Sequence, residues 1–523
     1  MHKLTLNQWY SLNNSILGGI IISNLKRREI FKKLEVQIMK EMYDSKMNLT
    51  MLTDFYELTM ANGYFKNGFK DTIGYFDMFY RTIPSAGGFV IMCGVEQVID
   101  YLSNLNFTDE DIEYLRTRGF GEDFLDYLKN FKFSCSVWAI PEGTPVFPGE
   151  PIIKVRGPII QAQFLETMIL LTINHQSLIA TKANRVVRAA DGRSVMEFGS
   201  RRAQSAQAAI LGARAAYIGG CVGTACTIDG RDYGIPALGT MAHSWVQLFD
   251  TELEAFRAYA REYPDNCTLL VDTYNVLKSG LPNAIKAFNE EVVPRGFRPK
   301  GIRIDSGDIT YLSKKARKML DDAGFPDCQI VASNSLDEYI IRDMLLQGAK
   351  VDSFGVGERL ITSSAHPVLD GVYKLVAIEN DGVITPKIKI SENVTKITTP
   401  CVKEVYRFYD KDTGKAEADV LTIEGEVIDE SKPYTLFDPN YTWKQKQITN
   451  FVAKPLLEQI FKDGECVYKK RTVKEIQEFC KEQIGTLWDE CLRFEHPHKY
   501  WVDLSQALYD EKYRLLKEYS SKI

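Results

Sequence analysis

The sequence lacks a long apolar run. No stretch approaches the roughly 20 apolar residues that a helix needs to cross a bilayer. The short apolar run at residues 16–22 is followed, rather than preceded, by Lys26, Arg27 and Arg28, which is the reverse of a secretory signal. We therefore expect no membrane segment and a cytoplasmic protein.

The sequence also lacks an excess of positive charge and a recognisable metal-ligand spacing. Its formal net charge is -5 over 523 residues, and no basic stripe with interleaved aromatic residues is present, so we expect no nucleic-acid partner. The ten cysteines are scattered. Cys480, Cys491, His496 and His498 fit no standard zinc spacing, and free thiols are favoured over a metal site.

A Gly-x-Gly-x-x-Gly opening is absent as well, although strand-like and helix-like segments alternate after residue 190. This alternation predicts parallel strands joined by helical crossovers. Without the glycine-rich opening, an irregular α/β barrel is favoured over a dinucleotide-binding sheet. The predicted strands lie at 194–198, 237–240, 269–272, 301–305, 329–333 and 351–355, with weaker candidates at 220–224 and 372–378.

The length suggests about two to four domains. We predict a leader (1–46), an N-terminal α/β domain (47–190), an α/β barrel that carries the active site (191–385) and a C-terminal accessory region (386–523). The leader is polar, unpatterned and followed by Met39, Met42 and Met47. We hypothesise that translation starts at Met39 or later.

Helical spacing and cap residues predict helices at 52–65, 108–130, 161–188 and 245–263. Residues 72–80 read as a strand, and residues 137–159, which are rich in proline and glycine, as short strands joined by turns. The accessory region contains an alternating stretch at 387–409 and a charged, amphipathic helical tail at 469–519.

His243 is one of only six histidines. It follows the apolar, proline-led run Ile235-Pro236-Ala237-Leu238 and stands in Gly239-Thr240-Met241-Ala242-His243-Ser244-Trp245. The exit of a strand is where α/β proteins place their chemistry. A lone histidine in this position is either a structural hydrogen-bonding residue or a catalyst.

The ends of the other predicted strands carry chemically related residues. They include Phe198-Gly199-Ser200-Arg201-Arg202, Asp272-Thr273-Tyr274, Arg303 with Asp305-Ser306-Gly307-Asp308, Ser333-Asn334 and Gly355-Val356-Gly357-Glu358. Arginines suit carboxylates or phosphates, small residues at a helix start suit phosphate, and carboxylates suit sugar hydroxyls or Mg²⁺. Singly, these motifs read equally well as a helix cap, a solvated arginine pair or a turn. Their shared place at the carboxyl ends of strands predicts one site for an anionic, phosphorylated sugar.

With these residues assembled, the chain resembles the nicotinate phosphoribosyltransferase family. The resemblance covers about residues 50–380 closely, on the motifs LTDFYELTMANGYF, FGSRRAQS, GTMAHS, LLVDTY, GIRIDSGD, ASNSLDEYII and DGVYKLVA. It implies a type II phosphoribosyltransferase fold and a homodimer with sites near the interface. The implied reaction converts nicotinate and phosphoribosyl pyrophosphate to nicotinate mononucleotide and pyrophosphate, coupled to ATP hydrolysis, with Mg²⁺ as cofactor.

The resemblance also implies roles for single residues. His243 becomes a transient phosphate acceptor, because a pyridine nitrogen attacks without needing a base. Nicotinate would contact Tyr56, Thr240 and Arg303, and Arg201 would be a further anion ligand. The remaining implied site residues are Asp305 and Asp308 as catalytic carboxylates, near which Mg²⁺ would bind with pyrophosphate, and Ser306, Gly307, Ser333, Asn334, Gly355, Gly357 and Glu358 as substrate ligands.

The chain departs from some family members at Glu358, where they carry threonine after the Gly-x-Gly. A backbone contact to phosphate is expected there rather than a hydroxyl contact. Two alternatives stay open: a nicotinamide-specific phosphoribosyltransferase, and a catalytically idle barrel that binds nucleotide as a sensor. A buried arginine that pairs a carboxylate favours nicotinate over its amide.

Overall fold

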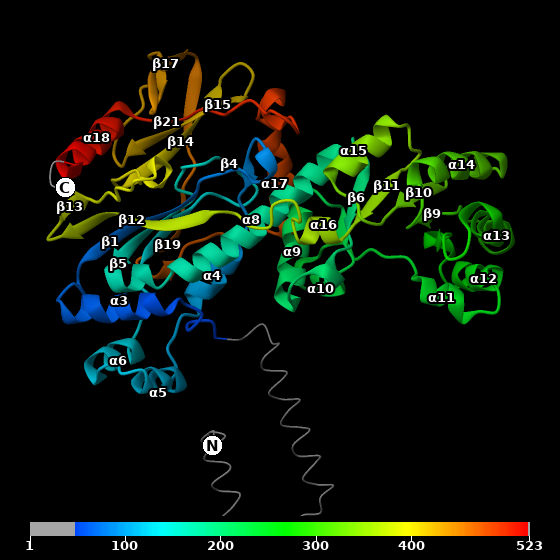
Figure 1. Ribbon diagram of the computed structural model, residues 1–523, viewed down its shortest axis with the longest axis horizontal. Coiled ribbons are helices and arrows are strands. Elements are labelled where there is room, and N and C mark those ends of the chain that lie inside the picture. The colour runs from blue at the N-terminus through cyan, green and yellow to red at the C-terminus, as the bar shows by residue number, and fades with distance from the viewer. Residues whose placement is uncertain (1–47, 521–523) are drawn as a thin grey trace, which may run out of the picture.

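The computed structural model describes residues 48–520. The predicted leader and the hypothesised start at Met39 lie outside the described residues. The described chain is elongated: a barrel occupies one end, two other sheets occupy the opposite end, and the long helix α8 (Glu166–Ala189) runs between them (Figure 1).

A seven-stranded sheet lies at the end opposite the barrel and combines three parts of the chain. Its order is β13-β12-β1-β5-β3-β19-β20, and its pairs are antiparallel. The strands are β1 (Ile73–Tyr80), β3 (Ser136–Ala139), β5 (Ile153–Pro158), β12 (Gly371–Asn380), β13 (Val383–Pro386), β19 (Glu458–Lys462) and β20 (Glu465–Cys466). A separate small ladder pairs β2 (Val90–Ile91) with β4 (Pro145–Val146).

One predicted barrel strand therefore belongs elsewhere. Residues 372–378 are a strand, as expected, but they pair with β1, so that Gly74 lies opposite Ile378. Tyr373 helps to explain why this strand joins the N-terminal sheet, because its ring stacks on that of Phe76 at 4.9 Å and is buried in the core of that sheet.

Helices cover this sheet near the predicted positions. The segment 108–130 is two helices, because Gly119 and Gly121 interrupt it, and the segment 161–188 is likewise divided. The elements are α3 (Phe55–Lys66), η1 (Pro84–Ala86), α4 (Val95–Ser103), α5 (Asp109–Thr117), α6 (Glu122–Lys129), α7 (Ile159–Gln163) and α8.

The barrel is a six-stranded parallel sheet of order β7-β6-β11-β10-β9-β8. Because β11 pairs with β6, the last strand closes onto the first, and the barrel stays open between β7 and β8. The strands are β6 (Ser194–Glu197), β7 (Gly223–Thr224), β8 (Thr268–Leu270), β9 (Gly301–Ile304), β10 (Gln329–Ala332) and β11 (Ser353–Val356). The predicted α/β barrel is confirmed.

The predicted strand at 237–240 is wrong. Only Ala237 forms an isolated parallel bridge, with Thr224. Pro236 has no N–H to extend a ladder, and residues 238–242 have no regular secondary structure before a helix begins at His243.

Helices surround the barrel, and the predicted helix at 245–263 is split into two, with Thr251 capping the second through the N–H of Glu254. The elements are η2 (Ser200–Arg202), α9 (Ala206–Ile218), α10 (Thr227–Tyr233), α11 (His243–Leu248), α12 (Glu252–Glu262), η3 (Pro264–Asn266), η4 (Val276–Gly280), α13 (Leu281–Ala287), η5 (Phe288–Val292), η6 (Val293–Arg295), α14 (Ile309–Asp322), α15 (Glu338–Leu346) and α16 (Glu358–Ile361).

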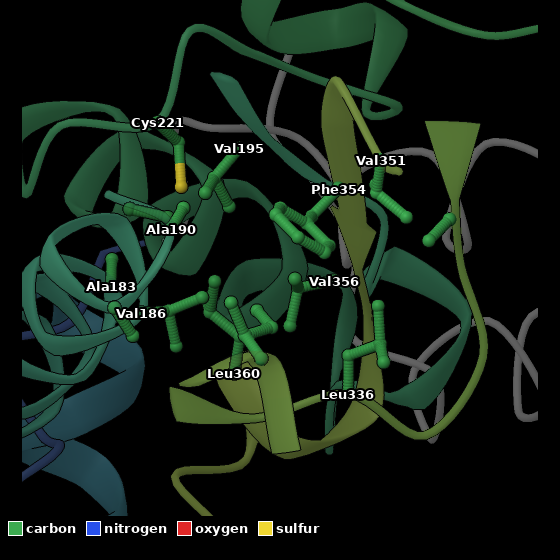
Figure 2. Packing of buried hydrophobic residues seen from close by; sticks show 14 of the residues in the cluster. Ala183, Val186, Ala190, Val195, Cys221, Leu336, Val351, Phe354, Val356 and Leu360 are labelled. Atoms are coloured by element: carbon green, nitrogen blue, oxygen red, sulfur yellow. The ribbon is translucent and has the colours of Figure 1, made fainter. Parts of the chain in front are cut away.

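The barrel core joins the strands to α8. Figure 2 shows Val195, Phe354 and Val356 of the strands close to Leu360 of α16, with Ala183 of α8 at one side. Small residues on α8 allow close approach of the helix, and the continuous apolar cluster fixes the barrel relative to the rest of the chain.

The C-terminal region adds a four-stranded sheet of order β18-β14-β15-β21 and a hairpin of β16 and β17. The predicted helical tail at 469–519 is confirmed only in part: it has a helix at each end, and the residues between them form a short 3-10 helix, irregular chain and β21. The elements are η7 (Val394–Lys396), β14 (Lys403–Asp410), β15 (Ala416–Ile423), β16 (Tyr434–Asp438), β17 (Tyr441–Ile448), β18 (Phe451–Pro455), α17 (Val473–Gly485), η8 (Asp489–Leu492), β21 (Val502–Leu504) and α18 (Gln506–Ser520). The domain boundaries at 47, 191 and 386 stay predictions.

No helix within residues 48–520 is long and apolar enough to span a membrane.

Candidate functional site

The candidate site lies at the carboxyl ends of the barrel strands. Since the six strands are parallel, the loops after β6, β7, β8, β9, β10 and β11 meet at one edge. The loop that carries His243 joins them through the bridge at Ala237. Most of the predicted site residues therefore come together, although they lie far apart in the sequence.

Arg303 is the central cation of this edge. Its Nη1 donates to Thr240 Oγ1 at 2.6 Å and to the Met241 carbonyl at 3.4 Å. Its Nη2 lies 4.0 Å from Asp305 Oδ2, and its Nε is buried without a hydrogen-bond partner among the described residues. Burial lowers the pKa of Arg303, against the opposing effect of Asp305 and Asp272. The guanidinium is thus desolvated and only partly paired.

A hydrogen-bonded set of carboxylates and hydroxyls lies beside Arg303. Asp272 Oδ2 accepts from the Asp305 N–H at 3.1 Å and from the Ser306 hydroxyl at 2.5 Å. Asp305 Oδ1 accepts from the Ser333 hydroxyl. Asp272 Oδ1 is buried, and no described residue donates to it. The ends of β8, β9 and β10 are therefore linked through side chains, with one carboxylate oxygen still available.

His243 is the first residue of α11 and is half-buried. Its Nδ1 lies 3.1 Å from Thr273 Oγ1, so the threonine fixes the orientation of the ring. The other ring nitrogen, Nε2, has no hydrogen bond to the described part of the chain. A histidine held at one nitrogen can present the other to a ligand.

Asp308, Gly307 and Asn334 shape the loops. Asp308 is exposed and caps α14, with Oδ1 accepting from the Tyr311 N–H at 2.9 Å. Gly307 has a φ of 81° and Asn334 a φ of 109°, and the side chain of Asn334 accepts from the Ser335 N–H at 2.8 Å. The contacts of Asp308 therefore agree with the interpretation of this residue as a helix cap, one of the alternatives that the sequence left open.

Two glycines, Gly355 within β11 and Gly357 just after it, lie against Phe198 at the end of β6. A Cβ at Gly355 would be 2.5 Å from a ring carbon of Phe198, and one at Gly357 would be 3.0 Å from the Phe198 carbonyl oxygen. Gly357 precedes α16, whose first residue, Glu358, is exposed and 3.8 Å from Arg202. Arg201 is exposed at the same edge.

Tyr56 is the one predicted residue that the single chain does not bring to this edge. It lies on α3, which Figure 1 places at the opposite end of the molecule from α11. Its side chain is 44% exposed. Burial of the hydroxyl, reinforced by Glu166, raises the pKa of Tyr56.

A buried carboxylate that the sequence pattern did not predict as part of the site lies beneath it. Glu197 ends β6 and is fully buried, and its Oε2 accepts from the Thr224 hydroxyl at 2.6 Å. Asp229 on α10 is also fully buried. The sequence does contain a hint of this role, since Glu197 is a charged residue at the end of the apolar strand Ser194-Val195-Met196-Glu197. Its hydrogen-bond partner Thr224, however, is 27 residues away.

Within the described residues no group of three or more histidine, cysteine, aspartate or glutamate side chains could hold a metal ion by itself. The ten cysteines, all within the described residues, form no disulfide.

An open parallel barrel with charged and hydroxyl side chains at the carboxyl ends of its strands defines an α/β-barrel enzyme of the kind whose loops bind and convert small molecules. Comparisons with known proteins give the family. Residues 51–174 match the nicotinate phosphoribosyltransferase N-terminal domain, residues 193–418 the nicotinate phosphoribosyltransferase family, and residues 402–512 the C-terminal domain of the same enzyme.

Full-length relatives agree with the domain matches. A nicotinate phosphoribosyltransferase of Bacillus subtilis is 42% identical over 477 residues, which cover 91% of this chain and 97% of the relative. Nicotinate phosphoribosyltransferase 1 of Arabidopsis thaliana is 34% identical, over 88% of this chain and 92% of its own. The chain belongs to the nicotinate phosphoribosyltransferase family.

The solved structures support the fold. The crystal structure of human nicotinic acid phosphoribosyltransferase superposes with a TM-score of 0.77 at 26% identity, over 89% of this chain and all of the human chain. A nicotinate-nucleotide pyrophosphorylase from Pyrococcus furiosus has the same fold, with a TM-score of 0.64 at 23% identity, over 85% and 98% of the two chains.

Proposed function

We propose that this chain transfers a phosphoribosyl group from phosphoribosyl pyrophosphate to nicotinate, giving nicotinate mononucleotide and pyrophosphate in NAD biosynthesis. The observation that carries this proposal is Arg303, a buried, partly paired guanidinium beside Thr240 at the barrel edge. The names of the relatives point to the same substrate.

In the proposed reaction the bond from ribose C1 to the pyrophosphate oxygen breaks, and a bond from C1 to the pyridine nitrogen forms. The pyridine nitrogen uses its own lone pair, so no proton has to be removed. Positive charge develops on the ribose and negative charge on the leaving group. Asp305 and Asp272 would stabilise the positive charge on the ribose, and Arg201 and Arg202 would stabilise the negative charge on the pyrophosphate.

Mg²⁺ would enter with pyrophosphate rather than on a site made by the protein alone. Asp272 Oδ1, buried and without a donor among the described residues, and the neighbouring Asp305 are the oxygen ligands that Mg²⁺ prefers. When bound, Mg²⁺ would neutralise part of the charge of the leaving group. Asp308 already accepts from the α14 backbone, so it is the weaker candidate of the three carboxylates.

We further propose that His243 accepts a phosphoryl group from ATP and couples its hydrolysis to transfer. The γ-phosphorus–oxygen bond of ATP breaks, a phosphorus–nitrogen bond forms at Nε2, and water later releases phosphate, leaving ADP and phosphate as products. Thr273 holds Nδ1 and thereby leaves Nε2 as the accepting atom. A phosphoryl group adds roughly two negative charges beside the donor site.

We propose a homodimer in which the partner supplies Tyr56. The support is the distance between α3 and the barrel edge within one chain (Figure 1), since a tyrosine that contacts the pyridine ring must then come from a second copy. Equal mixing of Tyr56→Ala and Arg303→Ala protomers should restore about a quarter of the wild-type activity if the sites are shared. Activity that does not rise on mixing would exclude the shared site.

The activity itself is tested by turnover with nicotinate and with nicotinamide. We expect nicotinate to be preferred by about a hundredfold or more, because a neutral amide leaves the Arg303 charge unpaired. Arg303→Ala should raise the nicotinate KM, while Arg298→Ala, at an exposed arginine paired with Asp327, should not.

Three results would contradict the proposal. Preference for nicotinamide would select the first alternative function. Nucleotide binding without release of pyrophosphate would select the sensor. An unchanged nicotinate KM in Arg303→Ala would remove Arg303 from the site.

A further inference from the structure

Glu197 accepts two side-chain hydrogen bonds at the barrel edge, one from the loop after β6 and one from the last residue of β7. One carboxylate oxygen accepts from the Gly199 N–H, and the other accepts from the Thr224 hydroxyl at 2.6 Å. Thr224 Oγ1 in turn accepts from the Cys226 N–H at 2.9 Å. A single buried carboxylate therefore ties the loop after β6 to the loop after β7.

The backbone of the loop after β6 packs closely against the carboxylate of Glu197. A Cβ at Gly199 would lie 2.7 Å from Glu197 Oε1 and 2.6 Å from the Ile361 Cβ of α16. Only glycine allows this approach without displacing its neighbours. The loop continues directly into η2, where Arg201 and Arg202 are exposed.

If Glu197 served only to fill the core, an apolar side chain would do so at a lower cost in folding free energy. Burial of a charged group costs free energy that an apolar side chain would avoid, and burial raises the pKa of Glu197 although Thr224 and Gly199 oppose the shift. The charge has no arginine or lysine within ion-pair distance among the described residues. What Glu197 does provide is a fixed acceptor for the two loops.

We propose that Glu197, through Thr224 and the Gly199 N–H, is a positioning residue that holds the Gly199–Arg202 loop in place for the pyrophosphate end of the donor substrate. This inference rests on the proposed function. It assigns Glu197 no contact with substrate. Its effect runs through Arg201, Arg202 and the loop backbone.

Kinetics with both substrates test the proposal. Thr224→Val removes the hydroxyl, and Glu197→Ala removes both acceptors. Each should raise the KM for phosphoribosyl pyrophosphate about tenfold or more, because a loosened loop misplaces its cations, and should change the nicotinate KM less than about twofold. Thr224→Ser keeps the hydroxyl and should restore the wild-type value. Thr422→Val, at a buried threonine of β15, is the matched control and should change neither KM.

Calorimetric titration of the purified protein with inorganic pyrophosphate and Mg²⁺ gives a second readout. Thr224→Val should bind pyrophosphate about tenfold more weakly than wild type while its thermal unfolding stays close to that of Thr422→Val. If Glu197→Ala does not fold, the result for Thr224→Val alone tests the positioning role. Equal increases of both KM values, or unchanged pyrophosphate affinity in folded Thr224→Val, would overturn the positioning role.

The outcome separates this inference from the proposed function. Wild-type protein that binds pyrophosphate but transfers nothing to nicotinate would refute the function, and the variants would still test the loop. Wild-type protein that neither binds pyrophosphate nor turns over would overturn both.

Discussion

Replacement of Asp229 by asparagine should stabilise the protein increasingly as the pH rises. Asp229 is fully buried on α10, and no described residue gives either carboxylate oxygen a hydrogen bond of ordinary length. The weak donor Cys226 lies nearby and only partly offsets the burial, and Glu197 and Asp232 add repulsion. Burial raises the pKa of Asp229 from 3.8 to about 6.

The sign follows from which form the folded state prefers. An acid whose pKa is higher in the folded than in the unfolded state folds more readily when it is protonated. The resulting cost is absent below pH 3.8, grows between 3.8 and 6, and is constant above. With about 1.36 kcal/mol per tenfold change in acidity, the cost is about 1.6 kcal/mol at pH 5 and about 3 kcal/mol at pH 8.

The asparagine side chain of the Asp229→Asn variant is uncharged at every pH. Any effect of the substitution on stability that does not depend on pH therefore cancels when the stability differences at two pH values are compared. The stability difference between Asp229→Asn and wild type should grow by about 1.4 kcal/mol from pH 5 to pH 8. Urea unfolding monitored by tryptophan fluorescence measures it. Asp265→Asn, at an exposed aspartate of η3, is the control and should follow the wild-type pH dependence closely. Parallel curves for Asp229→Asn and wild type would refute the argument.

Three other variants test the site and the packing around it. His243→Ala should lose the acceleration by ATP and keep slow ATP-independent transfer, measured as nucleotide product with and without ATP; full acceleration in the variant would exclude the phosphohistidine. Gly355→Ala should cost about 1–3 kcal/mol in urea unfolding because its Cβ meets the ring of Phe198, whereas Gly63→Ala, with open space around it, should be neutral or stabilising. Arg214→Met should cost about 3–5 kcal/mol, because it leaves the carboxylate of Glu142 buried without the guanidinium 2.8 Å away; a stability equal to wild type would contradict this.

The barrel could be predicted because its strands are continuous apolar runs that end in polar loops. Such runs identify β6, β9, β10 and β11 locally, since a strand buried on both faces is apolar throughout. The same signal does not say which sheet a strand joins. β12 was assigned to the barrel because it follows the barrel in the sequence, but its partner β1 lies about 300 residues earlier.

The site could be predicted as far as topology alone dictates it. Residues at the carboxyl ends of neighbouring parallel strands must meet, so order and spacing predict that Arg303, near the end of β9, lies close to Asp305 and Ser333, which follow β9 and β10. Glu197 was missed because its role depends on Thr224 and on the close approach of Gly199. Tyr56 marks a different limit, since the order of strands in one chain says nothing about a residue that we propose to act across an interface.

The charges at the barrel edge leave Arg303 without a close counter-charge, and we propose that an anionic ligand supplies it. Arg303 donates to two neutral oxygens, Thr240 Oγ1 and the Met241 carbonyl, while Asp305, the nearest carboxylate, is 4.0 Å away and already accepts from Ser333. A desolvated guanidinium held this way has lost water without gaining a close counter-charge, which burial makes costly. A carboxylate placed against it recovers that cost, and a carboxamide does not. The selectivity for the acid that we propose would thus require no repulsive element against the amide, only the incomplete pairing of Arg303.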